Sequence, residues 1–90
     1  MSSEIYLNHP NFGLLYRVCL LEERSELFAT LYAQRLFFIV KQQQGGRLQF
    51  SPVGRTDARS LVEQRLRMLR RNGQHDAYGA LQTTHKQTFQ

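Results

Sequence analysis

The sequence predicts a mainly β protein with α-helices, in which a small antiparallel barrel precedes a C-terminal two-helix hairpin. Up to residue 53, apolar residues recur with a period of two, which is typical of half-buried strands. From residue 54 onward they recur at spacings of three and four, which is typical of amphipathic helices. We therefore expect a β domain over residues 1–53 and two helices over residues 54–90.

Four segments of the first half have the composition and alternation of strands. They cover residues 12–21, 26–33, 35–41 and 47–53. Gly45 and Gly46 supply a turn before the last of them, and Pro52 indicates its end or an edge position in the sheet. Four or five short antiparallel strands in about 50 residues are typical of a small, strongly curved barrel of the SH3 or Tudor type.

The segment TDARSLVEQRLRMLRRNG predicts the first helix. Its stripe consists of Ala58, Leu61, Val62, Arg65, Leu66 and Leu69. We expect Thr56 to cap the helix, Asp57 to lie in its first turn, and Asn72-Gly73 to end it in a left-handed conformation.

A second helical stripe follows toward the C-terminus. It consists of Tyr78, Leu81, His85 and Phe89. Gly79 and three threonines weaken the helix propensity of this segment. Because neither short helix would persist alone in water, we expect the two to pack on each other or on the barrel.

The positive charge of the chain is concentrated in one segment. The net charge is +5, and residues 55–71 contribute six arginines against Asp57 and Glu63. A basic, SH3-like nucleic-acid-binding module is therefore an alternative function, with phosphate contacts from Arg59, Arg67, Arg70 and Arg71. The simpler interpretation is a solvated helix face in which Glu63 pairs with Arg67.

Other chemistry has little support in the sequence. Cys19 is the sole cysteine, which excludes an internal disulfide, and we expect it to be a buried thiol. His9, His75 and His85 are too scattered for a metal site, so we expect no metal. No nucleophile elbow, phosphate loop or paired carboxylates appear, so we expect neither an enzyme nor catalytic residues. No membrane segment or signal peptide appears, and we expect a soluble, cytoplasmic protein.

The central stretch LYAQRLFF is apolar on both faces of its predicted strand. Leu36, Phe38 and Val40 point to one side, and Phe37 and Ile39 point to the other. Either the barrel and the helices cover both sides, or part of the stretch is an exposed patch that binds a protein.

The loop before this strand lacks the residues that usually form turns. A two-residue loop sets Tyr32 opposite Arg35, whereas a three-residue loop sets Tyr32 opposite Leu36. In either case a tyrosine, an arginine and a leucine or phenylalanine project near a hairpin tip. Tyr and Arg dominate the energetics of many protein interfaces, which favours an exposed, protein-binding patch near this tip.

Four strings together resemble PipX, the family of small PII-interacting proteins of cyanobacteria. They are YLNHPNFGLLY, ELFATLYAQRLFF, VGRTDARSLVEQRLRMLRR and HKQTF, and the resemblance runs from Tyr6 to Phe89. The chain departs from the family mainly in LLEERS and KQQQGGRLQ. The resemblance implies a Tudor-like N-terminal domain, two C-terminal helices and an adaptor function.

The resemblance also implies particular partners. PipX-like proteins bind the 2-oxoglutarate-loaded NtcA dimer, a transcription factor of nitrogen control, and act as its coactivator. The PII trimer sequesters them when 2-oxoglutarate is scarce. Because the metabolite and the nucleotides bind the partners, we expect this chain to need no cofactor and no small-molecule ligand. Its helices are expected to swing out toward PII, RNA polymerase or another transcription regulator.

In the family, both partners compete for overlapping surface on the Tudor-like domain. This surface corresponds here to Glu4, Tyr6, Phe12, Tyr16, Tyr32, Gln34, Arg35, Leu36 and Phe38. The correspondence implies that Tyr32, Leu36 and Phe38 share a face, which favours the three-residue loop. It also implies that these three side chains lie uncovered in the free protein, where the two partners take turns covering them.

Overall fold

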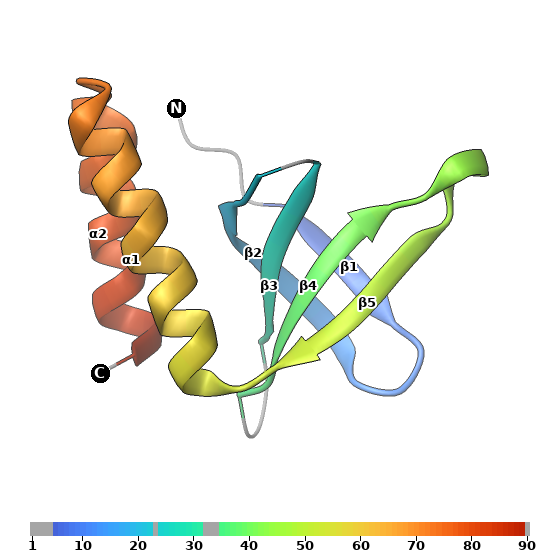
Figure 1. Ribbon diagram of the computed structural model, residues 1–90. Coiled ribbons are helices and arrows are strands. Elements are labelled where there is room, and N and C mark those ends of the chain that lie inside the picture. Colours follow the sequence, from blue (N-terminus) through green and yellow to red (C-terminus); the bar gives the residue numbers. More distant parts are fainter. Residues whose placement is uncertain (1–4, 23, 32–34, 90) are drawn as a thin grey trace.

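Five antiparallel strands followed by two helices make up the computed structural model, which describes residues 5–22, 24–31 and 35–89. The elements are β1 (Tyr6–His9), β2 (Gly13–Leu20), β3 (Ser25–Thr30), β4 (Phe37–Gln42), a 3₁₀ turn (Gln44–Gly46), β5 (Leu48–Val53), α1 (Arg55–Arg71) and α2 (His75–Phe89). The strand order is β1-β2-β3-β4-β5. The sheet curls into a half-barrel with both helices on one side, while the β4–β5 hairpin extends away from them (Figure 1). The predicted fold class is confirmed.

The side chains of β4 alternate between two hydrophobic clusters on opposite faces of the sheet. Phe37 belongs to the helix-facing cluster, whose buried members are Val18, Cys19, Leu27, Ala29, Phe37, Ala58, Val62, Leu69, Leu81 and Phe89. Phe38 and Val40 belong to the interior cluster of the half-barrel, together with Leu15 and Phe28. Both faces of β4 are therefore covered, which is the first of the two interpretations of the central stretch.

The expectation that Phe38 lies uncovered is wrong. Its side chain is 4% exposed. The helices do not cover it, because it lies in the interior cluster, where Ile5, Leu7 and Phe50 pack against the buried residues. The curl of the sheet brings β1 and β5 over the central strands, and strand alternation alone does not reveal that curl. Leu36, by contrast, is 36% exposed.

Strand β1 is absent from the predicted strands. Ile5 and Leu7 alternate with Tyr6 and Asn8, but the strand is only 4 residues long and Pro10 follows it closely. Such a short segment has little periodic signal of its own, and its pairing with β2, which sets Tyr6 opposite Tyr16, decides its conformation.

The alternation predicted for residues 12–21 is interrupted by a β-bulge. The pairing between β2 and β3 shifts between Arg17 and Cys19. An extra residue in one strand reverses the side-chain alternation beyond it, and Val18 and Cys19 accordingly both lie in the helix-facing cluster. Arg17 pairs with Phe28 in the ladder before the shift.

The observed register fits neither of the two loops predicted before β4. Ala29 pairs with Phe37, and the Leu36 N–H donates to Thr30 Oγ1 at 2.8 Å. The Thr30 N–H donates to the Leu36 carbonyl at 2.9 Å. Leu36 therefore lies opposite Thr30, whereas the favoured loop required it to lie opposite Tyr32, which is itself outside the described residues. Burial of Phe28 beside Phe38 sets this register, because a shift by one residue would reverse both faces.

The two ends of α1 differ in how well they were predicted. Gly54, not Thr56, is the N-cap residue and has no side-chain cap, while Asp57 lies in the first turn as expected. At the other end, Gly73 has a φ of +71°. The Gly73 and Gln74 N–H groups donate to carbonyls in the last turn, at 3.2 and 2.9 Å. This left-handed stop confirms the prediction from Asn-Gly.

Helix α2 packs through its predicted stripe. Leu81 and Phe89 are 7% and 6% exposed, and the Phe89 ring stacks on Phe37 with centroids 5.3 Å apart. The guanidinium of Arg55, the first residue of α1, lies 5.5 Å from the Phe89 ring centroid. Packing against the sheet thus stabilises a helix of weak propensity, as predicted.

Candidate functional site

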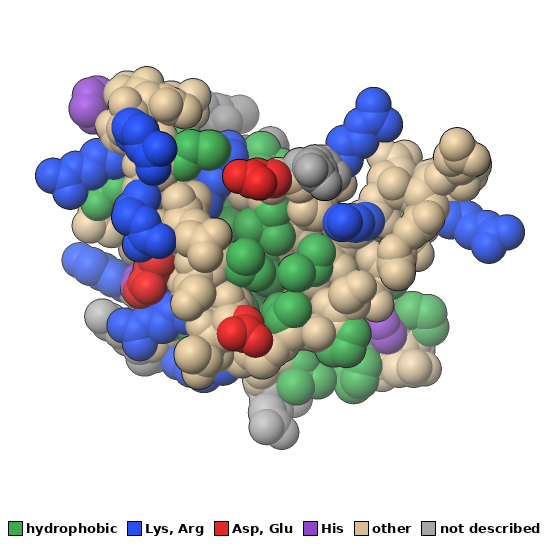
Figure 2. All heavy atoms as spheres, in the orientation of Figure 1, with side chains coloured by type: hydrophobic (Ala, Val, Ile, Leu, Met, Phe, Trp, Pro, Cys, Tyr) green, Lys and Arg blue, Asp and Glu red, His purple; other side chains and the backbone are tan. Residues whose placement is uncertain are grey.

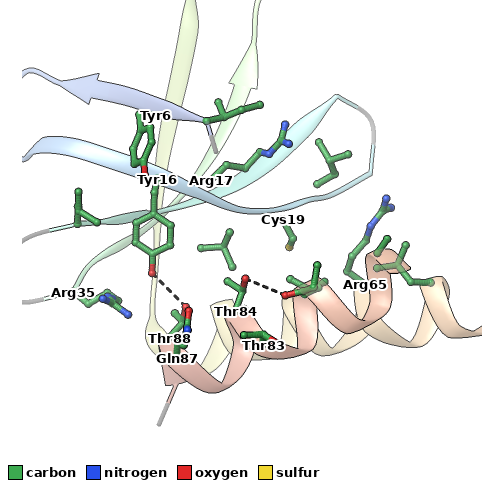
Figure 3. A pocket seen from close by; sticks show the side chains of 18 of the residues that line it. Tyr6, Tyr16, Arg17, Cys19, Arg35, Arg65, Thr83, Thr84, Gln87 and Thr88 are labelled. Atoms are coloured by element: carbon green, nitrogen blue, oxygen red, sulfur yellow. Dashed lines mark hydrogen bonds between the residues drawn. The ribbon is translucent and has the colours of Figure 1, made fainter. Parts of the chain in front are cut away.

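A groove of about 870 Å³ lies between the β1–β2 side of the sheet and α2 (Figure 3). We call it the sheet–α2 groove. Its aromatic and polar lining includes Tyr6, Tyr16, Arg17, Arg35, Arg65 and Thr88. Three of the predicted partner-binding residues, Tyr6, Tyr16 and Arg35, thus meet in one concave surface.

Tyr16 is held in this groove from two sides. Its hydroxyl shares a hydrogen bond of 3.3 Å with the Thr88 hydroxyl of α2, and the two groups face each other in Figure 3. The Arg35 guanidinium lies 5.5 Å from the Tyr16 ring centroid, in cation–π range. Tyr6, opposite Tyr16 in the register, is 43% exposed. The groove therefore presents two tyrosines: Tyr6 is exposed, and Tyr16 contacts Thr88 and Arg35.

The charge in the sheet–α2 groove is positive. Arg17, Arg35 and Arg65 line it, and no carboxylate occurs among its described lining residues. Arg17 is partly neutralised, because its Nη1 lies 3.0 Å from Glu26 Oε1. Arg35 and Arg65 are the cations that a bound group would meet.

Cys19 also lines the groove, but its chemistry is that of a buried thiol. It is 7% exposed, which confirms the prediction. Burial raises the pKa of the Cys19 thiol to about 12, an effect that the nearby Arg65 and Arg17 only partly oppose. A protonated thiol is a poor nucleophile, so this residue does not supply covalent chemistry at neutral pH.

Two other predicted site residues, Phe12 and Phe38, lie together outside this groove. Their ring centroids are 5.6 Å apart, and Phe12 is 48% exposed. His9 supports them: its Nδ1 accepts the Asn11 and Phe12 N–H groups at 3.0 and 3.3 Å. Its ring also stacks on Phe38 with centroids 5.2 Å apart. The predicted site residues thus fall into two groups on different faces of the sheet.

Of the remaining predicted site residues, Leu36 is exposed directly before β4. Glu4, Tyr32 and Gln34 lie outside the described residues. Sequence reasoning missed the contribution of α2, because Thr88 lies 72 positions from Tyr16. Nothing in a threonine of a polar helix indicates such a long-range contact.

The basic face of α1 is organised differently from the sequence-based prediction. Glu63 Oε2 lies 3.2 Å from Arg59 Nε and 3.2 Å from His85 Nε2, so Glu63 pairs with these two groups rather than with Arg67. The hydrogen bond from Arg59 is the largest cause of the lowered pKa of the Glu63 carboxyl. Arg67, Arg70 and Arg71 are exposed.

Within residues 5–22, 24–31 and 35–89, no three His, Cys, Asp or Glu side chains come together as ligands for one metal ion. In the same part of the chain, neither helix has the length and apolar character that a membrane crossing requires.

The candidate site thus consists of a curled β-sheet, a docked helical hairpin and an open groove lined by tyrosine and arginine side chains. The family model described as PII-interacting protein X matches residues 3–89, essentially the whole chain. The chain therefore belongs to the PII-interacting protein X family, as the sequence resemblance predicted. It is a PII-interacting protein of nitrogen signalling, from a family of signalling adaptors that is not a known enzyme family. A comparison with curated proteins found no match.

Proposed function

We propose that this protein is a nitrogen-signalling adaptor that alternates between two partners. It binds the 2-oxoglutarate-loaded NtcA dimer as a coactivator, and the PII trimer sequesters it when 2-oxoglutarate is low. The observation that carries the proposal is the family match over residues 3–89. Exposed aromatic side chains at Tyr6 and Phe12 support it, since protein interfaces are enriched in such groups.

The proposed partner surface is the β-domain set predicted from the sequence. It comprises Glu4, Tyr6, Phe12, Tyr16, Tyr32, Gln34, Arg35, Leu36 and Phe38. Within it, Tyr6, Phe12 and Leu36 are the exposed apolar members among the described residues. Phe38 would act from beneath Phe12, because its own side chain is 4% exposed. Sequestration then requires only that one surface cannot serve two partners at once.

Coactivation requires a difference in affinity. A protein shifts a regulator toward its active state only if it binds that state more tightly than the inactive one. We propose that 2-oxoglutarate and nucleotides bind NtcA and PII. This chain then binds one partner or the other according to the ligand state of those two proteins, without a cofactor of its own. The exchange takes place in the cytoplasm, because a signalling protein and a transcription factor must share one compartment to compete.

The two parts of the chain have separate roles in this proposal. Residues 1–53 carry the partner surface, and residues 54–90 form an accessory unit that contacts PII, RNA polymerase or another transcription regulator. Support for a role of the helices beside the partner surface comes from α2, which lines the sheet–α2 groove and is joined to Tyr16 by the Tyr16–Thr88 hydrogen bond.

Size-exclusion chromatography with the purified PII trimer tests the proposal. We expect co-elution in ADP and separation in ATP plus 2-oxoglutarate. The Tyr6→Ala variant should lose at least about tenfold in PII affinity, the range seen when an interface anchor is removed. Leu48→Ala is the control, because Leu48 and Tyr6 are both 43% exposed and Leu48 lies on β5. Equal co-elution in both nucleotide conditions, or equal losses for the two variants, would contradict the proposal.

A further inference from the structure

A second groove, with a volume of about 650 Å³, lies between α1 and the β4 side of the sheet. We call it the sheet–α1 groove. Among the described lining residues, it shares Leu20 and Arg65 with the sheet–α2 groove. Figure 2 shows hydrophobic side chains gathered at the surface between α1 and the strands, with lysine and arginine side chains to either side. None of the described members of the β-domain partner surface lines this groove.

The floor of the sheet–α1 groove is aliphatic and runs along the helix. Leu61 and Met68 stand seven residues apart on α1, which places them two turns apart on one side of the helix. Leu21, directly after β2, and Ile39 of β4 supply the rest of the floor, and both are only partly buried. An unbranched methionine among aliphatic side chains adapts to different apolar partners.

The rim of the sheet–α1 groove is positively charged. Lys41, Arg65, Arg67 and Arg71 line it, and Glu22 is the carboxylate among its described lining residues. Within the part of the chain that the structure describes, Lys41, Arg67 and Arg71 are exposed and the recorded ion pairs involve other residues. The groove thus combines an aliphatic floor with rim cations that form none of these ion pairs. Such a surface complements a ligand that is apolar in its centre and acidic at its edges.

We propose that the sheet–α1 groove binds an acidic, amphipathic helix of a partner protein. The groove extends along α1 from Leu61 to Arg71, about 15 Å at 1.5 Å per residue, which matches roughly three turns of a bound helix. The apolar stripe of that helix lies on Leu61 and Met68, and its carboxylates meet the rim arginines. This site is separate from the β-domain partner surface, and its α1 residues lie in the accessory unit of residues 54–90. The proposal does not depend on binding of PII or NtcA to the β domain.

Two other occupants fit the groove less well. Single-stranded nucleic acid binds through stacking on aromatic side chains, and the described lining of this groove has none. A second copy of this chain would bring a further net charge of +5 against a basic rim, which is repulsive.

A designed peptide tests the proposal. The probe is a fluorescein-labelled, end-capped 16-residue helix of alanine, leucine and glutamate, with leucines on one face and glutamates beside them. We expect its fluorescence anisotropy to rise on titration with the full chain. The amide resonances of Leu61 and Met68 should shift in the same titration. The charge-reversal variant Arg67→Glu/Arg71→Glu should weaken binding at least about tenfold, as should replacement of the peptide glutamates by lysine.

A matched double variant controls for general charge effects. Arg47→Glu/Arg70→Glu carries the same charge change at two exposed positions outside the groove, and it should bind the peptide within about threefold of wild type. Circular dichroism establishes that both double variants are folded. Absence of peptide binding, equal weakening by the two variants, or tighter binding of a DNA oligonucleotide than of the peptide would each overturn the proposal.

Discussion

The two hydrophobic clusters lie on opposite faces of one sheet but are built from different parts of the chain. The buried members of the interior cluster run from Leu15 to Val40, all within the sheet. The helix-facing cluster joins Val18 of β2 to Phe89 at the end of α2. The first cluster therefore forms when the sheet folds, whereas the second also requires the helices to dock.

The difference in size between the clusters matters for stability. Among the described residues, the helix-facing cluster has ten buried members and the interior cluster has four. The helices therefore supply a large part of the buried apolar surface of a small domain, even though α2 has weak helix propensity. The sheet therefore determines the shape of the molecule, while docking of the helices provides much of its buried apolar surface.

The largest expected effect is in the interior cluster. Phe28 is 1% exposed, and its replacement by alanine should lower the free energy of unfolding by about 3–5 kcal/mol, because a large cavity opens among β-strands that cannot relax. Urea denaturation followed by circular dichroism measures the loss. Phe12→Ala, at a position 48% exposed, serves as the control and should cost less than about 1 kcal/mol. Similar losses for both variants would contradict the assignment of Phe28 to the core.

An intermediate effect is expected at the helix-facing cluster. Phe89→Ala should lower the free energy of unfolding by about 2–3 kcal/mol, less than for Phe28, because a site at the end of α2 relaxes more easily. Hydrogen exchange should speed up across residues 75–89 more than in β3 and β4, since the helix can undock while the sheet persists. Uniform loss of protection in sheet and helices would show that the two clusters unfold as one unit.

The thiol of Cys19 reports on the same interface. With a pKa raised from 9.0 to about 12 by burial, the folded protein holds roughly a thousandfold less thiolate at pH 8 than the unfolded chain does. Because the neutral form is favoured in the folded state, its contribution to stability is complete below pH 9 and is lost as the pH rises toward 12.

We therefore expect slow reaction of Cys19 with a disulfide reagent in the native protein at pH 8 and fast reaction in urea. The Phe89→Ala variant should react faster than wild type, since undocking of α2 exposes the thiol. Unchanged reactivity in that variant would mean that Cys19 stays covered without the helix.

The smallest effect is expected at the surface between the two helices. Hydrogen bonding to Arg59 lowers the pKa of Glu63 below its ordinary value of 4.5. A carboxyl with a lowered folded-state pKa stabilises the protein above pH 4.5, and this contribution disappears as the pH falls through the folded value. Glu63→Gln should therefore narrow the difference in Tm between pH 6 and pH 3. Glu22→Gln is the matched control and should leave that difference unchanged; equal responses of both variants would refute the link to Arg59.

The two regions also differ in how much of them could be predicted. In the helices, the stripes, Asp57 in the first turn and the stop at Gly73 followed from spacing and residue type, because these are local properties of an α-helix. In the sheet, β1, the bulge at Val18 and the position of Leu36 opposite Thr30 were missed. Each of these depends on which strand lies beside which, and pairing is a non-local property.

The same distinction between local and non-local properties applies to the candidate site. Tyr6, Tyr16 and Arg35 were singled out from the sequence through the family resemblance, and the structure brings them into one groove. That Phe38 is buried beneath Phe12, and that Thr88 of α2 holds Tyr16, could not be inferred. Both contacts arise where segments far apart in the chain meet.

The amino-acid sequence alone determined the class of fold, the change from strands to helices near residue 54, the buried character of Cys19 and the family. These follow from periodicity, composition and motif, all of which are properties of neighbouring residues. The tertiary structure alone decided which apolar residues remain exposed and where the two grooves lie. Burial depends on how far the sheet curls and where the helices dock, and both are set by contacts between distant parts of the chain.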